Sequence, residues 1–241
     1  MHFLSLETST KNFSLSVSKD DQVLRFKNHA SAKLLEDSII LTIDSILDAA
    51  KLPLKKVDAF AIGLGPGSFT SLRVGLSTVK AFAMACQKPV VGVCSLDVLA
   101  QGVGHIPCDE ICVLIDARRG MVYSAIYQPA KNGLKRKGSY HLSPLDAVLD
   151  QVHGRTLFVG DGAELYRKEI EAAYKECAAK NPSSCKASFA GEKYAKADAR
   201  HLAKLAFERL ALKDYDDIGK LQPIYLYAED CQVTPKAASR A

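Results

Sequence analysis

The sequence predicts an α/β protein made of two lobes. Segments typical of strands and helices alternate after an opening meander of three strands, and from about Glu110 the same order partly recurs. With 241 residues, 48% of them hydrophobic, the chain is long enough to bury a sizeable core and to divide in two. We expect a first lobe over residues 1–104 and a smaller second lobe over 105–241, whose last helix can return to the first lobe.

Each element of the first lobe is predicted from its local pattern. Residues 2–8 have the composition of a buried strand, and 12–18 alternate between apolar residues and serine, as a half-buried strand does. A short polar turn then leads to the third strand, over 22–28. The remaining elements are a helix over 32–51, a strand over 57–64, a helix over 68–87 and a strand over 90–94.

The second lobe begins with two strands, over 111–116 and 121–128, and Asn132-Gly133 forms a turn into a further strand. A helix begins near Ser143-Pro144, because proline is favoured in the first helical turn. The following elements are a strand over 156–159, a helix that ends near residue 180, a polar and irregular stretch over 181–193, and a last helix over 195–212.

The glycine-rich turn before the helix over 68–87 is the most informative segment of the chain. Gly65 and Gly67 permit backbone angles that other residues resist, and Pro66 fixes φ between them. Ser68 is a good N-cap, and the free N–H groups of the next helical turn make a possible anion site. The turn has neither the Walker lysine nor the dinucleotide glycine spacing, so a tight turn without a ligand explains it at least as well.

The helix over 68–87 carries two seams, whereas an ordinary surface helix needs one apolar stripe. The apolar seam comprises Phe69, Leu72, Leu76, Val79, Ala83 and Cys86, and the small-residue seam comprises Ser71, Val74, Thr78, Ala81 and Ala85. Arg73, Ser77 and Lys80 occupy the remaining arc. Small residues allow another helix to approach closely, so the second seam packs either on the first helix or the other lobe, or on a separate polypeptide.

The helix over 32–51 also presents apolar residues on two sides. Its broad apolar arc comprises Leu35, Ile39, Ile43, Ile46, Leu47 and Ala50. Leu34 and Leu41 lie on the opposite side, among acidic and hydroxyl side chains. Apolar side chains in such surroundings favour an outside partner.

The cysteines and the ends of the chain bear on its cellular compartment. The seven cysteines form no CxxC pair and are scattered, which predicts free thiols in a reducing compartment. Neither a signal segment nor a run of membrane-spanning length is visible. We therefore expect a cytoplasmic protein that does not contact a membrane.

The net charge of +5 is mild, and its basic residues form only short clusters. Lys55-Lys56, Arg118-Arg119 and Lys135-Arg136-Lys137 are explained as solvated loops, with a weak contribution to holding an RNA backbone as the alternative.

The histidines give no indication of a catalytic metal site. They stand at positions 2, 29, 105, 141, 153 and 201, so no two lie three or four residues apart and a helical pair of imidazole ligands cannot be built. The HExxH and GxSxG elements of hydrolases are absent as well. We predict no catalytic residue and no metal site.

Four segments together resemble the TsaB (YeaZ) family. In chain order they are Leu6-Glu7-Thr8-Ser9-Thr10, then Gly65-Pro66-Gly67-Ser68-Phe69-Thr70 with Leu72-Arg73-Val74-Gly75, then Ile115-Asp116-Ala117-Arg118-Arg119-Gly120-Met121-Val122-Tyr123, and finally Leu221-Gln222-Pro223-Ile224-Tyr225-Leu226. They follow the family's order and span almost the whole chain. The resemblance implies the fold of actin-like ATPases, sugar kinases and Hsp70, which begins with the element order predicted here.

The resemblance also implies a function. A TsaB protein is a noncatalytic scaffold of the machinery that adds threonylcarbamoyl to adenosine 37 of tRNAs. A TsaD subunit performs the transfer, a TsaE ATPase drives turnover, and tRNA is bound through the complex. The chain would need no cofactor of its own, because ATP or ADP and metal would be held by the partner subunits. Alone, it would form a homodimer.

Family members pair through the two helices described above. The contact residues that the resemblance implies are Leu34, Leu41, Arg73, Val74, Ser77, Lys80 and Ala81. Ser71 departs from the family, which generally has glycine there, and slightly thickens the small-residue seam.

The resemblance also marks possible nucleotide-binding positions, because actin-like ATPases place an acidic residue and hydroxyls after the first strand. Here Glu7 is followed by Thr8, Ser9 and Thr10, whereas family members usually carry aspartate at the first position. The longer side chain would displace a metal by about one methylene and weaken octahedral Mg²⁺ geometry. We therefore prefer a turn in which the three hydroxyls satisfy backbone groups.

A second possible nucleotide contact lies in the other lobe. Gly160 and Gly162 could cradle a nucleotide, but a turn in which Asp161 caps the following helix is the favoured interpretation. Two alternative functions stay open beside the scaffold. One is an autonomous ATP-dependent kinase or ATPase of the same superfamily, and the other is a homodimeric interaction protein.

Overall fold

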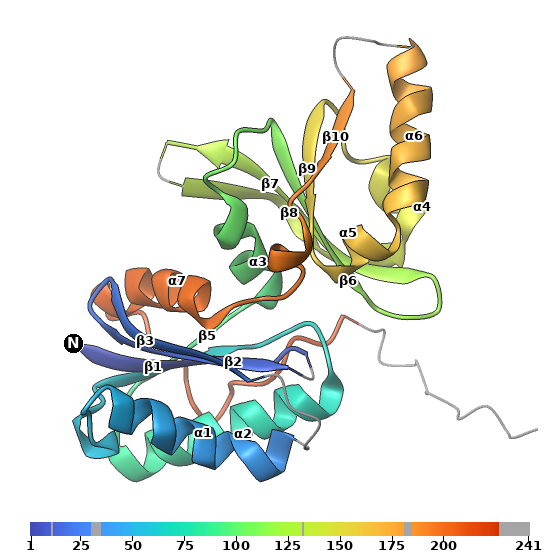
Figure 1. The fold of residues 1–241 in the computed structure, drawn as a ribbon. Coiled ribbons are helices and arrows are strands. Elements are labelled where there is room, and N and C mark those ends of the chain that lie inside the picture. Colours follow the sequence, from blue (N-terminus) through green and yellow to red (C-terminus); the bar gives the residue numbers. More distant parts are fainter. Residues whose placement is uncertain (11, 30–34, 132, 181–184, 227–241) are drawn as a thin grey trace, which may run out of the picture.

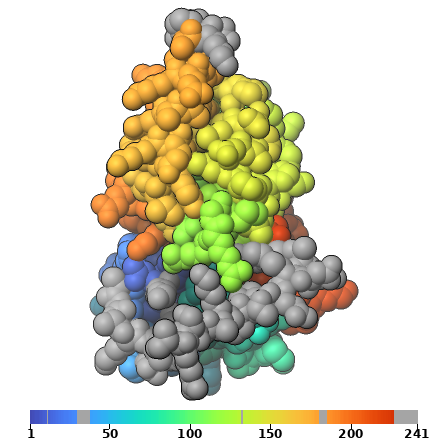
Figure 2. Space-filling model, turned by 90° about the vertical axis from the view of Figure 1, so that its right-hand side faces the viewer, coloured from blue at the N-terminus to red at the C-terminus, as the bar shows by residue number. Residues whose placement is uncertain are grey.

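The computed structural model describes residues 1–10, 12–29, 35–131, 133–180 and 185–226. It consists of two lobes, each built on a five-stranded mixed sheet (Figure 1). Figure 2, turned by 90°, shows the second lobe (yellow and orange) standing on the first and narrowing away from it.

The first lobe contains β1 (His2–Glu7), β2 (Phe13–Lys19), β3 (Gln22–His29), β4 (Ala59–Gly63) and β5 (Val90–Val93). Its strand order is β3-β2-β1-β4-β5. The first three strands form the predicted antiparallel meander, while β4 and β5 run parallel to β1. The connections that lead to and from β4 therefore have to cross the sheet, which places helices on its faces.

Both faces of this sheet are covered by helices. The helices α1 (Leu35–Ala49) and α2 (Phe69–Cys86) lie on one face, and α7 (Ala199–Ala211) lies on the other (Figure 1). Because successive side chains of a strand point to opposite faces, Leu4 packs in the cluster that contains Ile43, and Phe3 packs in the cluster that contains Leu202. Burial on both sides explains why neither face of β1 is exposed, even at Ser5 and Glu7. A single 3₁₀ turn, η1 (Leu54–Lys56), precedes β4.

The second lobe repeats this topology. It contains β6 (Glu110–Asp116), β7 (Met121–Ala130), β8 (Gly133–Pro144), β9 (Arg155–Val159) and β10 (Lys186–Phe189), with α4 (Leu145–Leu149), α5 (Asp161–Leu165) and α6 (Arg167–Lys180) between its later strands. The order β10-β9-β6-β7-β8, read in reverse, again gives an antiparallel meander followed by two parallel strands. The recurrence expected from the sequence is thereby confirmed, and with it the two-lobed actin-like fold class.

Two segments connect the lobes. The helix α3 (Ser95–Val103) leaves β5 and packs on β6 and α7, and the 3₁₀ turn η2 (Glu192–Tyr194) leads the chain back to α7. Near the start of α3, Asp97 accepts hydrogen bonds of 2.6 Å from the hydroxyls of both Tyr127 and Tyr140, which ties this helix to β7 and β8. The exact division of the lobes, between residues 104 and 105, stays a prediction.

Several boundaries differ from the sequence prediction. The irregular stretch expected over 181–193 contains β10, a short edge strand whose polar composition gives little signal. The helix expected up to residue 180 is broken into α5 and α6 at Tyr166, whose φ of −101° leaves the helical range. The last helix begins only at Ala199, because Asp198 caps it by accepting the Arg200 N–H.

The prediction that all the cysteines are free thiols is wrong for one pair. Cys177 near the end of α6 and Cys185 before β10 form a disulfide with a Cα–Cα distance of 6.0 Å. The fold brings the two together because α6 returns the chain to the sheet edge where β10 begins. Cys86, Cys94, Cys108 and Cys112 are free, and Cys231 lies outside the described residues. Among the residues described, no helix is long and apolar enough to cross a membrane.

Candidate partner interface

The apolar seam of α2 faces the first sheet, as predicted. Leu72, Leu76, Val79 and Ala83 are buried, and Cys86 is half-buried against the same core. Phe69 is the exception, since its side chain is 53% exposed at the start of the helix. Four residues at alternating spacings of three and four are therefore enough to hold α2 on the sheet.

The small-residue seam of α2 is covered only at its N-terminal end. Ser71 is buried, and Val74 and Thr78 are half-buried where Ile39 and Ile40 of α1 approach them. Ala81 and Ala85, further along the helix, are exposed. Packing on the first helix thus accounts for the N-terminal half of the seam, and the C-terminal half is open.

The outward face of α2 carries the residues implied as contacts. Arg73, Ser77 and Ala81 are exposed, and Val74 and Lys80 are half-buried beside them. Further apolar surface at the end of the same helix comes from Met84, which is 66% exposed.

The helix α1 adds its own apolar side chains to this surface. Leu41 is 70% exposed, and its neighbour Ile40, which the sequence analysis missed, is 47% exposed. A shallow hollow of about 410 Å³ lies between the two helices and is lined by Ile39, Ile40, Arg73, Val74, Ser77 and Thr78. Leu34 lies outside the described residues. We call the exposed surface of α1 and α2 the paired-helix face.

The aromatic cluster at the start of α2 holds Arg73 in place. The Arg73 guanidinium lies 3.8 Å from the centre of the Phe69 ring, and its Nε donates a 3.1 Å hydrogen bond to the Tyr225 hydroxyl. Tyr225 reaches this point because the N–H of Ile224 bonds to the carbonyl of Leu64, 2.9 Å away. The last of the four sequence segments therefore packs beside the second, a contact that the sequence analysis did not predict.

The glycine-rich turn is explained by close packing against the end of β1. A Cβ on Gly67 would lie 2.1 Å from the Ser9 carbonyl oxygen, and a Cβ on Gly75 would lie 2.2 Å from the Thr8 Oγ1. The Ser68 N–H donates to that same Ser9 oxygen over 2.7 Å. The Ser68 hydroxyl makes no capping bond and instead shares a 2.9 Å hydrogen bond with that of Ser71.

Glu7 is fully enclosed at the end of β1. Its carboxylate accepts hydrogen bonds from the Ser9 N–H at 2.8 Å and from the Ser95 hydroxyl at 3.0 Å. Burial raises the pKa of Glu7 above its ordinary value, and the hydrogen bonds from Ser9 and Ser95 only partly oppose this. A Cβ on Gly63 would collide with the carboxylate, so the strand next to β1 is shaped to receive it.

The hydroxyls after Glu7 face the protein itself. Thr8 and Ser9 are buried, and the Thr10 hydroxyl donates to the carbonyl of Asn12. The predicted turn is met only in part, because Thr10 bonds a backbone carbonyl whereas the buried Thr8 Oγ1 has no hydrogen-bond partner among the described residues. In the described part of the chain, no group of three histidine, cysteine or acidic side chains is placed to hold a metal ion.

The glycines after β9 also make room for backbone. A Cβ on Gly160, whose φ is +106°, would lie 2.1 Å from the Leu114 carbonyl oxygen, and one on Gly162 would lie 3.0 Å from the same residue. The prediction that Asp161 caps the helix is wrong, because the N-cap of α5 is Gly160; the Asp161 carboxylate instead accepts the Asp116 N–H at 3.0 Å, which joins α5 to β6. Neither these glycines nor residues 7–10 line the two inter-lobe cavities, of about 610 and 710 Å³.

Comparisons with known proteins agree with the four sequence segments. The family described as TsaD, tRNA N6-adenosine threonylcarbamoyltransferase, matches residues 29–229. The TsaB protein of Escherichia coli K12 is 30% identical over 177 residues, which cover 67% of this chain and 72% of the relative. The TsaB protein of Bacillus subtilis 168 is 26% identical over 84% of this chain and 92% of its own.

Solved structures show the same relationship. Two structures of YeaZ or a YeaZ-like protein from Pseudomonas aeruginosa superpose with TM-scores of 0.77 and 0.74, each at 25% identity. They cover 94% and 93% of this chain and 99% of their own. The chain belongs to the TsaB (YeaZ) family.

Proposed function

We propose that this chain is a noncatalytic subunit of the machinery that adds threonylcarbamoyl to adenosine 37 of tRNA. In this role it stabilises and activates a TsaD-type catalytic subunit. The relatives from E. coli and B. subtilis carry the name of tRNA threonylcarbamoyladenosine biosynthesis proteins, which places them in this process. The observation that carries the proposal for this chain is the paired-helix face.

The physical chemistry of that face suits helices from another subunit. Leu41, Ile40 and Met84 are large apolar side chains left partly in water, and burying the exposed part of each would be worth roughly 0.7–2 kcal/mol. The small exposed Ala81 permits close approach of a partner helix. Arg73 is already oriented by Phe69 and Tyr225, so it loses little rotamer freedom on binding.

The remaining partners follow from the same assembly. A TsaE-type ATPase and the tRNA dock on the complex, and ATP or ADP and metal are held by the partner subunits. The enclosed Glu7 supports this division of labour, because its Oε1 already accepts the Ser9 N–H and its Oε2 already accepts the Ser95 hydroxyl. Without a partner, the chain forms a homodimer through the paired-helix face. We place the protein in the cytoplasm, away from membranes.

A competing function, an autonomous kinase or ATPase, needs a carboxylate free to hold Mg²⁺. The burial and hydrogen bonding of Glu7 speak against it. A purely homodimeric interaction protein would use the same face, and reconstitution distinguishes it from a scaffold. We expect threonylcarbamoyladenosine to form only when this chain, TsaD and TsaE are all present, and formation without this chain would contradict the proposal.

The assignment of the face is tested by a charge at its most exposed leucine, Leu41 of α1. Leu41→Glu is expected to abolish co-purification with TsaD and most of the modification, because an acidic group would be buried without a partner. Leu212→Glu is the matched control, since Leu212 is 81% exposed and lies just beyond α7. Equal loss of modification in both variants would show that the paired-helix face is not the docking surface.

A further inference from the structure

A cavity of about 610 Å³ lies where the two lobes are connected, and most of its ionisable lining residues are basic. Its walls come from α3, α7, η2 and the first residues of β8. Its ionisable lining comprises Lys193, Lys196, Arg200, Lys204, His105 and His201, with Asp198 as the single carboxylate. None of these residues belongs to the paired-helix face or to the four family segments.

The one carboxylate is already neutralised. The Asp198 carboxylate accepts hydrogen bonds from the Nε and the Nη2 of Arg200, at 3.1 and 2.7 Å, and from the backbone N–H of Arg200. In the part of the chain that the structure describes, no ion pair joins Lys193, Lys196 or Lys204 to an acidic side chain. The cavity therefore carries positive charge that nothing in its lining compensates, which favours an anionic ligand.

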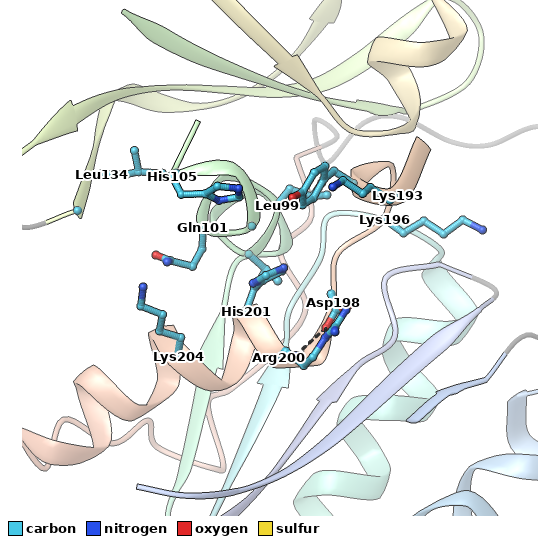
Figure 3. Close-up of a pocket in the computed structure, with 15 residues that line it drawn as sticks. Leu99, Gln101, His105, Leu134, Lys193, Lys196, Asp198, Arg200, His201 and Lys204 are labelled. Atoms are coloured by element: carbon cyan, nitrogen blue, oxygen red, sulfur yellow. Dashed lines mark hydrogen bonds and ion pairs between the residues drawn. The ribbon is translucent and has the colours of Figure 1, made fainter. Parts of the chain in front are cut away.

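The polar groups converge on one region of the cavity. Figure 3 shows His105 and His201 projecting from α3's end and from α7 into the same space, with Gln101 and Lys204 on one side and Lys193 on the other. Lys196 extends away from this group. Imidazole N–H groups and lysine ammonium groups are donors that bind phosphate oxygens.

The His201 ring is held in position by its neighbours. A Cβ on Gly102 would lie 3.0 Å from the His201 Cδ2 and 3.1 Å from its Nε2, so the ring rests against the backbone of α3. Burial is the main cause that lowers the pKa of His201. The ring therefore rests in a set position, which a ligand can use without ordering a flexible side chain.

The rest of the cavity is apolar. Leu99, Leu134 and Tyr194 line it, and the Tyr194 ring lies 6.3 Å from that of His105. Small-molecule sites have volumes of roughly 300–1,000 Å³ and combine apolar walls with a few convergent polar groups. This cavity has both properties.

We propose that this cavity binds a small phosphomonoester that carries a ring, of the class of a nucleoside monophosphate. Lys204, Lys193 and the two histidines hold the phosphate, and the ring lies against Leu99, Leu134 and Tyr194. Because both connections between the lobes contribute to the walls, a bound ligand fixes the lobes relative to each other. The proposal is independent of the assigned role in tRNA modification.

Isothermal titration calorimetry of the full chain with adenosine monophosphate tests the proposal. We expect binding that is at least about tenfold tighter than that of either adenosine or inorganic phosphate, because each probe lacks half of the contacts. Equal affinity for the nucleotide and inorganic phosphate would overturn the assignment of the ring site. If the chain bound a single-stranded oligoribonucleotide but not adenosine monophosphate, the assignment to a small ligand would be wrong.

Substitutions locate the site. Lys204→Glu is expected to weaken nucleotide binding by at least about tenfold, while Lys204→Arg retains it. Lys168→Glu, at an exposed position of α6, removes the same charge and leaves binding unchanged. The His105 and His201 ring signals in NMR spectra should shift on addition of the nucleotide. The proposal is wrong if Lys204→Glu and Lys168→Glu bind equally well, or if the ring signals stay in place.

Discussion

Replacing Gly67 by alanine is expected to lower the free energy of unfolding by about 2–4 kcal/mol. The added Cβ would lie 2.1 Å from the Ser9 carbonyl oxygen and 2.9 Å from the Ser9 Cβ, whereas non-bonded heavy atoms rest at about 3.5 Å. The turn or the end of β1 must therefore withdraw, and overpacking of this kind costs about 1–3 kcal/mol. Withdrawal also breaks the 2.7 Å hydrogen bond from the Ser68 N–H to that oxygen, worth about 1 kcal/mol.

The assay is urea unfolding of the isolated chain, followed by circular dichroism. For a protein of this size the expected loss corresponds to a fall in Tm of about 5–15 °C. Gly219→Ala is the control, because its nearest neighbour is the flexible Asp217 carboxylate at 3.2 Å, and its cost should stay within about 0.5 kcal/mol. Equal midpoints for the two variants would refute the claim that the glycine-rich turn is shaped by packing against β1.

Two further predictions concern Glu7 and Tyr225. Burial raises the pKa of Glu7 in the folded chain, so the stability that its protonated form contributes is fully present below the ordinary pKa of 4.5 and is lost as the pH rises through the folded-state pKa. Glu7→Gln cannot titrate, so the free energy of unfolding of this variant, measured with urea, should change less between pH 5 and pH 8 than that of the parent. The same pH dependence in both proteins would contradict the burial of the Glu7 carboxyl group. Tyr225→Phe removes the 3.1 Å hydrogen bond that the Tyr225 hydroxyl accepts from Arg73, and it leaves the contact between Arg73 and the Phe69 ring. We expect the affinity for TsaD, measured by calorimetry, to fall by about 1 kcal/mol. The free energy of unfolding should change by less than about 0.5 kcal/mol. Unchanged affinity would show that Arg73 does not contribute to the face.

Elements with strong periodicity were predictable from the sequence. The alternation of Phe13, Leu15 and Val17 with serine marked β2, and the spacing of Leu72, Leu76 and Val79 marked the buried side of α2. The pattern predicted the strand but not its burial: β2 was expected to be half-buried, yet Ser14 and Ser16 are buried as well, because they bond to Ala199 at the start of α7.

Features that depend on distant segments could not be found in this way. The strand β10 has a polar sequence and exists because the backbone of β9 pairs with it. The Phe69, Arg73 and Tyr225 cluster joins residues 152 or more apart in the chain. The exposure of Ile40 could not be predicted, because helical periodicity shows only which side of α1 is apolar. The angle at which α1 packs on its neighbours decides which residues at the border of that side stay in water.

The glycine signature illustrates why a motif alone leaves its role open. From the sequence, the turn around Gly67 fits an anion site and a tight ligand-free turn equally well. The structure adds the Ser9 carbonyl oxygen, which occupies the space beside Gly67 and accepts the Ser68 N–H. One of the helical N–H groups that would have served an anion is thereby used within the protein.

The most direct test of the scaffold assignment is the affinity of the Ala81→Glu variant for a TsaD-type subunit, measured by calorimetry. Ala81 is exposed, so the variant should fold like the parent, while an unpaired carboxylate enclosed by partner helices costs several kcal/mol, a loss of at least about a hundredfold in affinity. Ala172→Glu, the same change at an exposed position of α6, should bind like the parent. Parental affinity in Ala81→Glu would contradict docking through the paired-helix face.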